Sequence, residues 1–359
     1  MRDDPAPRPL APTLDRRAPR SRNGAMGALV IDCHVHLAGM GGGGSGCRIA
    51  PRLARRLPVR YLLWRHGISP GGRVDLPDDR FVARLAATVA AAQRVDRVVA
   101  LAFDALYDEG GHRRDGETLF YVPNDYLLTV CDRHPELLPG VSIHPYRTDA
   151  LAELARCVAR GAVAVKWLPS VQGMDPANRR CIPFYERLAE LRLPLICHTG
   201  REHVFPPRFL PLEDPRRLLL PLEVGVTVIA AHAGSLGALT GREGFGDRVA
   251  LSAAWPNLYA DLAGMAIPGR GRHLALLARC RHLHPRLVHG SDYPVEAMVL
   301  PFAAELGRKR LAALRQIRNP LDRDLCLKEG LGFPRALFER AYHLLARVDG
   351  PGGAALRHG

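Results

Sequence analysis

The 359-residue chain has almost no lysine: it contains only Lys166, Lys309 and Lys328, although lysine and arginine together number 50. Arginine therefore supplies nearly all of the positive charge behind a formal net charge of +14, and it is spread along the chain. No helix-turn-helix, zinc-finger or RNP-type signature accompanies this charge. We therefore expect no nucleic-acid partner.

The sequence also lacks any apolar run approaching the ~18 residues of a membrane span, so no membrane partner is expected. Its eight cysteines include no C-x-x-C pair, which predicts reduced thiols and a cytoplasmic location. The alternative fold is an open doubly wound sheet. Residues 1–26 lack apolar periodicity, so we predict a disordered Arg/Pro-rich arm there and a single domain over residues 27–359.

What the chain does contain is a repeating alternation of short β-rich runs and amphipathic, helix-like segments. The runs cover residues 28–37, 96–104, 137–146, 161–169, 193–200, 226–234, 257–264 and 285–294. Continuous apolar strands that alternate with helices predict parallel pairing with both faces buried. Eight repeats are the number that closes a (β/α)8 TIM barrel, so we predict an α/β fold of this class with long loops after the strands.

Ionisable side chains gather at or near the carboxyl ends of five of these runs, where barrel enzymes carry their chemistry. They are His34, His36, Lys166, His198, His232 and Asp292. His34 and His36 lie two residues apart, so on a strand they face the same side. One buried histidine alone is more often a hydrogen-bonded core residue. Burying six ionisable groups around one opening would be unfavourable unless a divalent cation paired them.

The motif IDCHVH, together with His198, His232 and the Asp292 of HGSDYP on later runs, resembles the amidohydrolase superfamily of metal-dependent barrel enzymes. The resemblance covers residues 28 to about 345. It implies that both histidines of the motif and Asp292 bind a metal, and that Asp292 also takes the proton from attacking water. It further implies that His198 and His232 bind a second metal where one is present.

In superfamily members with one metal, the resemblance implies that His198 completes the ligand set and that His232 acts as an acid or base near the water. Lys166 distinguishes the one-metal site from the two-metal site. Two-metal members carry on this strand a lysine carbamylated by CO₂, whose carboxylate bridges the ions. A lysine at this position of an arginine-rich chain favours that carbamate, because a guanidinium could not form it. The alternative is an unmodified Lys166 that contacts a substrate carboxylate or an acidic neighbour.

Several residues that follow strand ends are candidates for lining a substrate pocket. They are His144, Arg147, Trp167, Glu202, His203 and Tyr293. Asp32 is expected to face the same side as His34, and it resembles the family's acid that orients a metal ligand. The glycine-rich stretch over residues 39–46 follows the first run, where it could form a movable lid or an insertion without a role.

These observations predict a metal-dependent hydrolase in which a zinc ion activates water to cleave an amide, ester or lactone bond of a small molecule. The alternative is a metal-dependent non-oxidative decarboxylase of a small aromatic or unsaturated carboxylic acid. A binding protein on an inactive barrel is disfavoured, because no member of the ligand set is missing. Barrels of this type often dimerise, so a homodimer remains open.

Overall fold

The computed structural model describes residues 28–66, 78–200, 202, 204–206, 208–234 and 254–345. Eight strands form one sheet in which strands that follow one another along the chain pair in parallel. They are β1 (Ile31–His36), β3 (Arg97–Leu101), β5 (Leu137–Val141), β6 (Ala164–Trp167), β7 (Leu195–His198), β8 (Val228–Ala231), β9 (Leu258–Asp261) and β10 (Leu287–Val288). Each falls within one of the predicted runs, so that prediction is confirmed. The arm predicted over residues 1–26 lies outside the described ranges.

The sheet closes into a barrel where the chain that follows β10 meets β1. The amide of Cys33 donates a hydrogen bond to the carbonyl of His289 at 3.0 Å, and the amide of His36 donates one to the carbonyl of Tyr293 at 2.7 Å. Val35 and Tyr293 form a parallel bridge between these contacts. The fold is therefore the predicted α/β TIM barrel.

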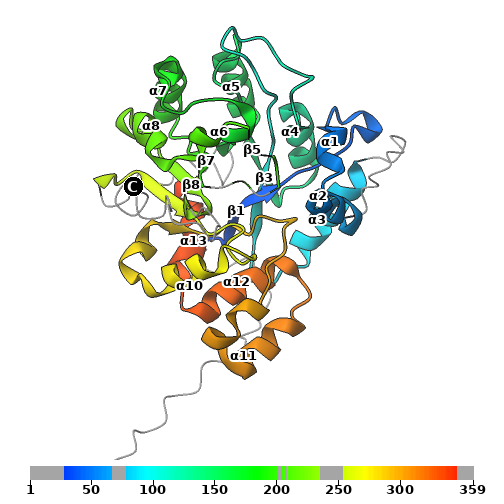
Figure 1. The fold of residues 1–359 in the computed structure, drawn as a ribbon, viewed down its shortest axis with the longest axis vertical. Helices are drawn as coiled ribbons and strands as arrows, with labels where there is room; N and C mark the ends of the chain where they lie inside the picture. Colours follow the sequence, from blue (N-terminus) through cyan, green and yellow to red (C-terminus); the bar gives the residue numbers. More distant parts are fainter. Residues whose placement is uncertain are drawn as a thin grey trace, which may run out of the picture.

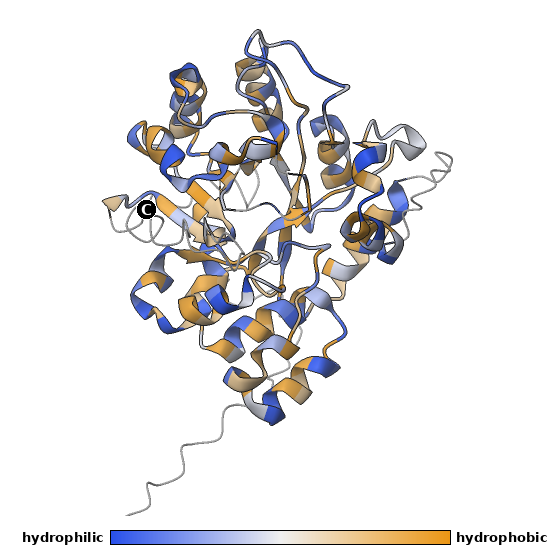
Figure 2. Ribbon diagram, viewed as in Figure 1, coloured by the Kyte–Doolittle hydropathy of each residue, from blue (hydrophilic) through white to orange (hydrophobic). Residues whose placement is uncertain are grey.

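Helices surround the strands on the outside of the barrel (Figure 1). The longer ones are α3 (Asp79–Ala90), α4 (Asn124–Arg133), α5 (Ala150–Ala159), α7 (Ile182–Glu190), α10 (Gly271–Arg279), α11 (Ala303–Gln316), α12 (Pro320–Leu331) and α13 (Arg335–Leu344). Shorter ones include α6 (Pro169–Gln172) and α8 (Leu219–Glu223). Helix α3 shows the usual pattern, burying Phe81, Leu85 and Val89 at helical spacing. Figure 2 shows hydrophobic strands at the centre and helices that mix hydrophobic and hydrophilic residues around them.

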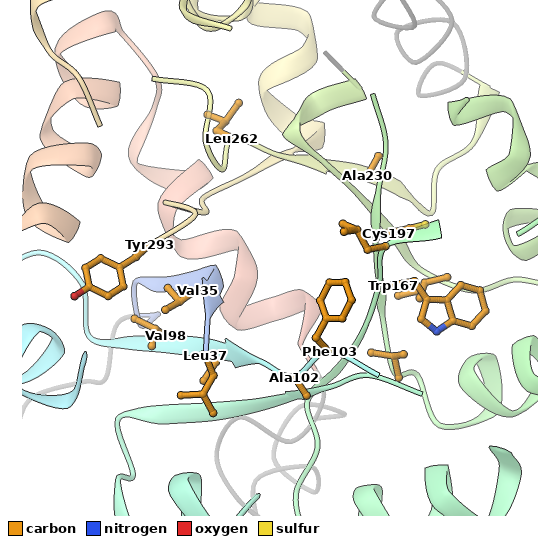
Figure 3. Close-up of a cluster of buried hydrophobic side chains, with 14 of the residues drawn as sticks. Val35, Leu37, Val98, Ala102, Phe103, Trp167, Cys197, Ala230, Leu262 and Tyr293 are labelled. Carbon is orange, nitrogen blue, oxygen red and sulfur yellow. The ribbon is translucent and has the colours of Figure 1, made fainter. Parts of the chain in front are cut away.

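Strand residues alternate between two buried clusters. The inner cluster takes side chains from every strand of the sheet and fills the barrel interior, and Ala164 and Ile196 belong to it. The outer cluster lies between strands and helices, and it includes Val165, Trp167 and Cys197 (Figure 3). This alternation follows from the period of two along a strand. A polar side chain at a strand end therefore reaches the barrel mouth only if it points to the same side of its strand as the residues of the inner cluster.

The facing of side chains changes partway along β1. Ile31 and Cys33 belong to the inner cluster, whereas Val35 belongs to the outer one. The pairing register with β3 shifts between Asp32 and Val35, which accounts for the change. The expectation that Asp32 faces the same side as His34 is therefore wrong, because the shift separates the two residues.

The chain between β1 and α3 builds a wall beside the barrel mouth. It contains β2 (Arg48–Ile49), α1 (Pro51–Ala54) and α2 (Leu57–Arg65), and β2 pairs with β4 (Phe120–Tyr121) in a small antiparallel sheet.

The glycine-rich stretch at the start of this segment is anchored. The Asp78 carboxylate accepts hydrogen bonds from the amides of Met40 at 2.8 Å and Gly41 at 3.0 Å, and from the Ser45 hydroxyl. Gly41 has a φ of 94°, a left-handed conformation that favours glycine. Glycine at this position therefore allows a turn that is held in place by hydrogen bonds to the buried carboxylate of Asp78.

Within the ranges that the structure describes, no helix is long and apolar enough to cross a membrane. All eight cysteines are free thiols, and six of them are buried. The cysteines therefore match the predicted reduced state.

Candidate metal centre

Three side chains converge at the carboxyl end of the barrel with ligand atoms close enough for one metal ion. His34 and His36 project from β1, and Asp292 follows β10. One donor atom from each lies within 4.8 Å of the other two. The two Nε2 atoms are 3.3 Å apart, and the Oδ1 atom of Asp292 lies 3.2 Å from Nε2 of His36. Two imidazole nitrogens and a carboxylate are a donor set that zinc and similar divalent metals accept.

The ring of His34 is oriented by a carboxylate from β9. Its Nδ1 atom lies 2.7 Å from Oδ2 of Asp261, and both residues are fully buried. An ionised carboxylate only accepts hydrogen bonds, so Nδ1 carries the proton and Nε2 presents a lone pair to the cluster. The other oxygen of Asp261 accepts the amide of His232 at 2.8 Å, which fixes this carboxylate in turn.

Lys166 of β6 lies next to His34 in the barrel interior. Its Nζ atom lies 3.1 Å from Nε2 of His34, and the side chain is 1% exposed. Burial lowers the pKa of Lys166, against the opposing effect of Asp261 and Asp292. A neutral amine is the form that could react with CO₂. It also lies next to the imidazole of His34 without the free-energy cost of a buried positive charge.

His198 and His232 form a second pair next to this cluster. Nε2 of His232 lies 3.2 Å from Nδ1 of His198, and Nδ1 of His232 lies 2.8 Å from the carbonyl oxygen of Ala263. A carbonyl only accepts, so His232 carries its proton on Nδ1 and His198 carries its own on the Nδ1 that donates to His232. Nε2 of His198 then presents a lone pair, and it lies 3.4 Å from Oε2 of Glu202.

Burial keeps these imidazoles neutral. It lowers the pKa of His34, and it places the pKa values of His198 and His232 well below the usual range. For Asp292, burial alone would raise the pKa, but the hydrogen bond from His36 and the nearby histidines bring it below its usual value. Neutral imidazoles and an ionised carboxylate are the forms that bind a metal, so the residues fit a divalent ion.

The backbone at Asp292 is held in an unusual conformation. Its φ of 73° lies in the left-handed region, which aspartate and asparagine adopt more readily than most residues. The amide of Asp292 donates to the carbonyl of His34 at 2.9 Å, and the amide of Ser291 donates to Asp32 at the same distance. A side chain at Gly264 would collide with the Asp292 carboxylate, so glycine there leaves the space that this carboxylate fills.

A cavity of about 150 Å³ opens beside the cluster. His36, His198, His232 and Asp292 line one end of it, so four of the predicted metal and catalytic residues reach this cavity. Glu202, a predicted substrate-binding residue, lines it as well.

Four other predicted substrate-binding residues do not line the described part of this cavity. Trp167 follows Lys166 directly, so it faces the outer cluster, where its ring stacks on Phe184. Tyr293 is also turned outward, with its hydroxyl 3.4 Å from Nδ1 of His66. Figure 3 shows both rings pointing away from the barrel centre.

His144 and Arg147 lie in a separate polar network. Nε2 of His144 lies 3.0 Å from the carbonyl oxygen of Gln172, and Arg147 forms ion pairs with Asp104 and Asp149. The remaining candidate, His203, lies outside the described residues.

Two residues of the site were not predicted. Asp261 lies within the seventh predicted run, residues 257–264, and ends β9, so an acidic side chain in an apolar run was the signal that could have identified it. Arg270 lines the cavity from the loop before α10 and is 3% exposed, and a single arginine in an arginine-rich chain gave no such signal. Burial lowers the pKa of Arg270, and Glu202 and Asp292 are the main carboxylates that oppose this effect.

A known protein family matches the part of the chain that contains the metal cluster. The model of the family described as Amidohydrolase matches residues 31–324. A search of curated proteins finds no match.

Solved structures share the fold at low sequence identity. An uncharacterized TIM-barrel protein from Bordetella bronchiseptica has a TM-score of 0.54 at 19% identity, over 84% of this chain and 100% of that one. A protein from Pseudomonas putida assigned as a 2-pyrone-4,6-dicarboxylic acid hydrolase has a TM-score of 0.51 at 18% identity, over 90% and 97%. A protein from Acinetobacter baumannii with the same assignment has a TM-score of 0.50 at 12% identity, over 87% and 95%. These similarities establish the barrel fold.

Proposed function

The chain belongs to the amidohydrolase family, and from that membership we propose that it is a metal-dependent hydrolase that cleaves an amide, ester or lactone bond of a small molecule. The observation that carries the proposal is the convergence of His34, His36 and Asp292 within 4.8 Å at the end of a cavity. These three residues would hold the metal. When bound there, a divalent ion supplies Lewis acidity, which lowers the pKa of water and polarises a carbonyl oxygen.

Residues in and around the cluster would accept the proton, orient a metal ligand and exchange a proton during hydrolysis. Asp292 is ionised and lines the cavity, so one of its oxygens is free to accept a proton from the attacking water. Asp261 holds the ring of His34 with Nε2 toward the cluster. His232 is neutral with Nε2 next to His198, so it can exchange a proton at that atom as the reaction proceeds.

We expect the protein, purified without chelator, to contain about one equivalent of a divalent metal, with zinc the first candidate. Elemental analysis measures the metal, and hydrolysis is followed on a panel of neutral esters, lactones and anilides. Chelation should abolish hydrolysis and restored metal should recover it. Folded, never-chelated protein with less than about half an equivalent would count against the site.

We propose a one-metal site in which Lys166 stays unmodified, because His34, His36 and Asp292 are the one group of three ligand residues within 4.8 Å that the described part of the chain contains. Replacing Lys166 with methionine, which keeps a long unbranched chain without the amine, should therefore leave the metal content at about one equivalent. Metal analysis of both proteins measures this directly. Circular dichroism shows whether the variant is folded. A wild-type content of two that falls to one in the folded variant would instead establish a bridging carbamate.

A second candidate function is the decarboxylation of a small aromatic or unsaturated acid. Arg270 favours it, because a buried guanidinium that lines the cavity beside Asp292 could hold a substrate carboxylate. Release of CO₂ from benzoate or cinnamate derivatives, in protein that leaves every ester, lactone and anilide intact, would select this function over hydrolysis.

A further inference from the structure

The described lining of the cavity beside the metal cluster is mostly apolar, and its polar side chains are those of His36, His66, His198, Glu202, His232, Arg270 and Asp292. Its wall from the β1–α3 segment presents Ile49, Leu53, Val59, Leu62 and Leu63. Helix α2 supplies three of these side chains, and Val59 and Leu63 lie one helical turn apart on its buried face. The one hydrogen-bonding side chain that the described part of this segment adds to the lining is the imidazole of His66, which directly follows α2.

Another part of the lining is aromatic. Phe81, Phe120 and Phe205 line it, and the ring of Phe205 packs on Phe120 at 5.8 Å between centroids and stacks on Phe103 at 5.6 Å. Rings that pack on one another hold their positions, so this wall is a preformed apolar surface. His66 also lines the cavity, but burial lowers the pKa of its ring, which therefore carries no charge at neutral pH.

The charges along the described lining limit what the cavity can bind. Arg270 is its one permanent cation, and the carboxylates of Glu202 and Asp292 act on it most strongly. A carboxylate placed along the apolar side chains, away from Arg270 and from the metal cluster, would lose its hydration there without a cationic partner among these residues. A neutral substrate, or one with a single negative charge, meets no such penalty.

On the basis of the proposed function, we infer that the substrate is an ester, amide or lactone with an apolar acyl chain or ring. The apolar body contacts the apolar side chains of α2 and the phenylalanine rings of the lining, and the scissile carbonyl lies next to His36 and Asp292. Each methylene removed from water by these walls strengthens binding by about threefold. Affinity and specificity therefore increase with chain length until the cavity is filled.

Two measurements test this inference. The first is kcat/KM for p-nitrophenyl esters of acetate, butyrate, hexanoate and octanoate, which should rise by about threefold per methylene over the lengths that the cavity admits. The second is calorimetric binding of acetamide, butyramide and hexanamide to metal-depleted protein. It should show the same dependence of affinity on chain length without requiring catalysis.

A matched pair of variants on α2 assigns the effect to the cavity. Leu62 lines the cavity and is partly buried, whereas Leu57 on the same helix is 76% exposed and does not line it. Leu62→Asn should flatten the chain-length dependence in both measurements. Leu57→Asn introduces the same residue into the same helix, and it should behave like the wild type.

The outcomes separate the two proposals. Ester hydrolysis without chain-length dependence, or a preference for an ester that carries two carboxylates, would overturn the apolar substrate class and leave the hydrolase standing. Chain-length-dependent amide binding without hydrolysis of any ester would support the apolar class and reject the hydrolase. Equal effects of Leu62→Asn and Leu57→Asn would show that the cavity wall does not select the substrate.

Discussion

Replacing Asp292 with asparagine is expected to lower kcat by at least ~100-fold, the usual scale for loss of a general base. The carboxylate lies 3.2 Å from His36 and lines the cavity, so it can accept a proton there. Asparagine keeps the size and one acceptor oxygen but loses the charge. It also tolerates the left-handed backbone at this position, where φ is 73°, so the local conformation should survive.

The measurement is kcat on the best ester, lactone or anilide, with metal content determined on the same sample. Retained metal together with lost turnover would identify Asp292 as the base. Glu202→Gln is a matched control, because it neutralises another carboxylate that lines the same cavity and lies outside the three-residue cluster. It should reduce kcat far less. A fully active Asp292→Asn protein would refute the hydrolytic mechanism.

The fold was predictable because its signal repeats. Short apolar runs alternate with amphipathic segments along the sequence, and eight such runs leave few alternatives to a closed barrel. The cluster of His34, His36 and Asp292 followed from the same logic, since polar side chains at strand ends meet at one edge. Position along a strand was therefore sufficient to bring these residues together.

The substrate-binding residues were harder to predict, because a position after a strand end does not fix the path of a loop. Trp167 could have been excluded from the strand alone, since it alternates with Lys166 and so faces the helices. His144 and Arg147 could not, because the polar network that holds them depends on Asp104, which follows β3, and on Gln172 of α6. The wall from α2 also went unpredicted, since the sequence does not show that this helix folds back over the barrel mouth.

The identity of the acid that orients His34 depended on a feature without a sequence signal. Alternation along a regular strand assigns Asp32 to the same face as His34, but the register shift after Asp32 breaks that relation. In the structure one oxygen of Asp32 accepts the amides of His34 and Ser291, and the other has no hydrogen-bond partner among the described residues. Asp261, from a strand distant in the chain, contacts the ring instead.

Asp261→Asn is accordingly expected to weaken metal binding by about 10- to 100-fold, the usual cost of losing a partner that orients a metal ligand. The asparagine oxygen can still accept the amides of His232 and Ala263, which bond to Oδ1 of Asp261. Its NH₂ group then faces Nδ1 of His34 and donates to it. That contact moves the imidazole proton to Nε2, the atom that the metal needs free.

Asp32→Asn is the matched control for this prediction, since it makes the same change in a buried acid that accepts the backbone amides of His34 and Ser291, whereas the ring of His34 contacts Asp261. Metal affinity is measured for both variants by competition with a chelator of known affinity, and circular dichroism establishes that each is folded. Asp32→Asn should retain near wild-type affinity, because the tautomer of His34 does not depend on it. The reverse order, with affinity lost in Asp32→Asn and kept in Asp261→Asn, would return the orienting role to Asp32 and show that the contact between Asp261 and His34 does not set the metal ligand.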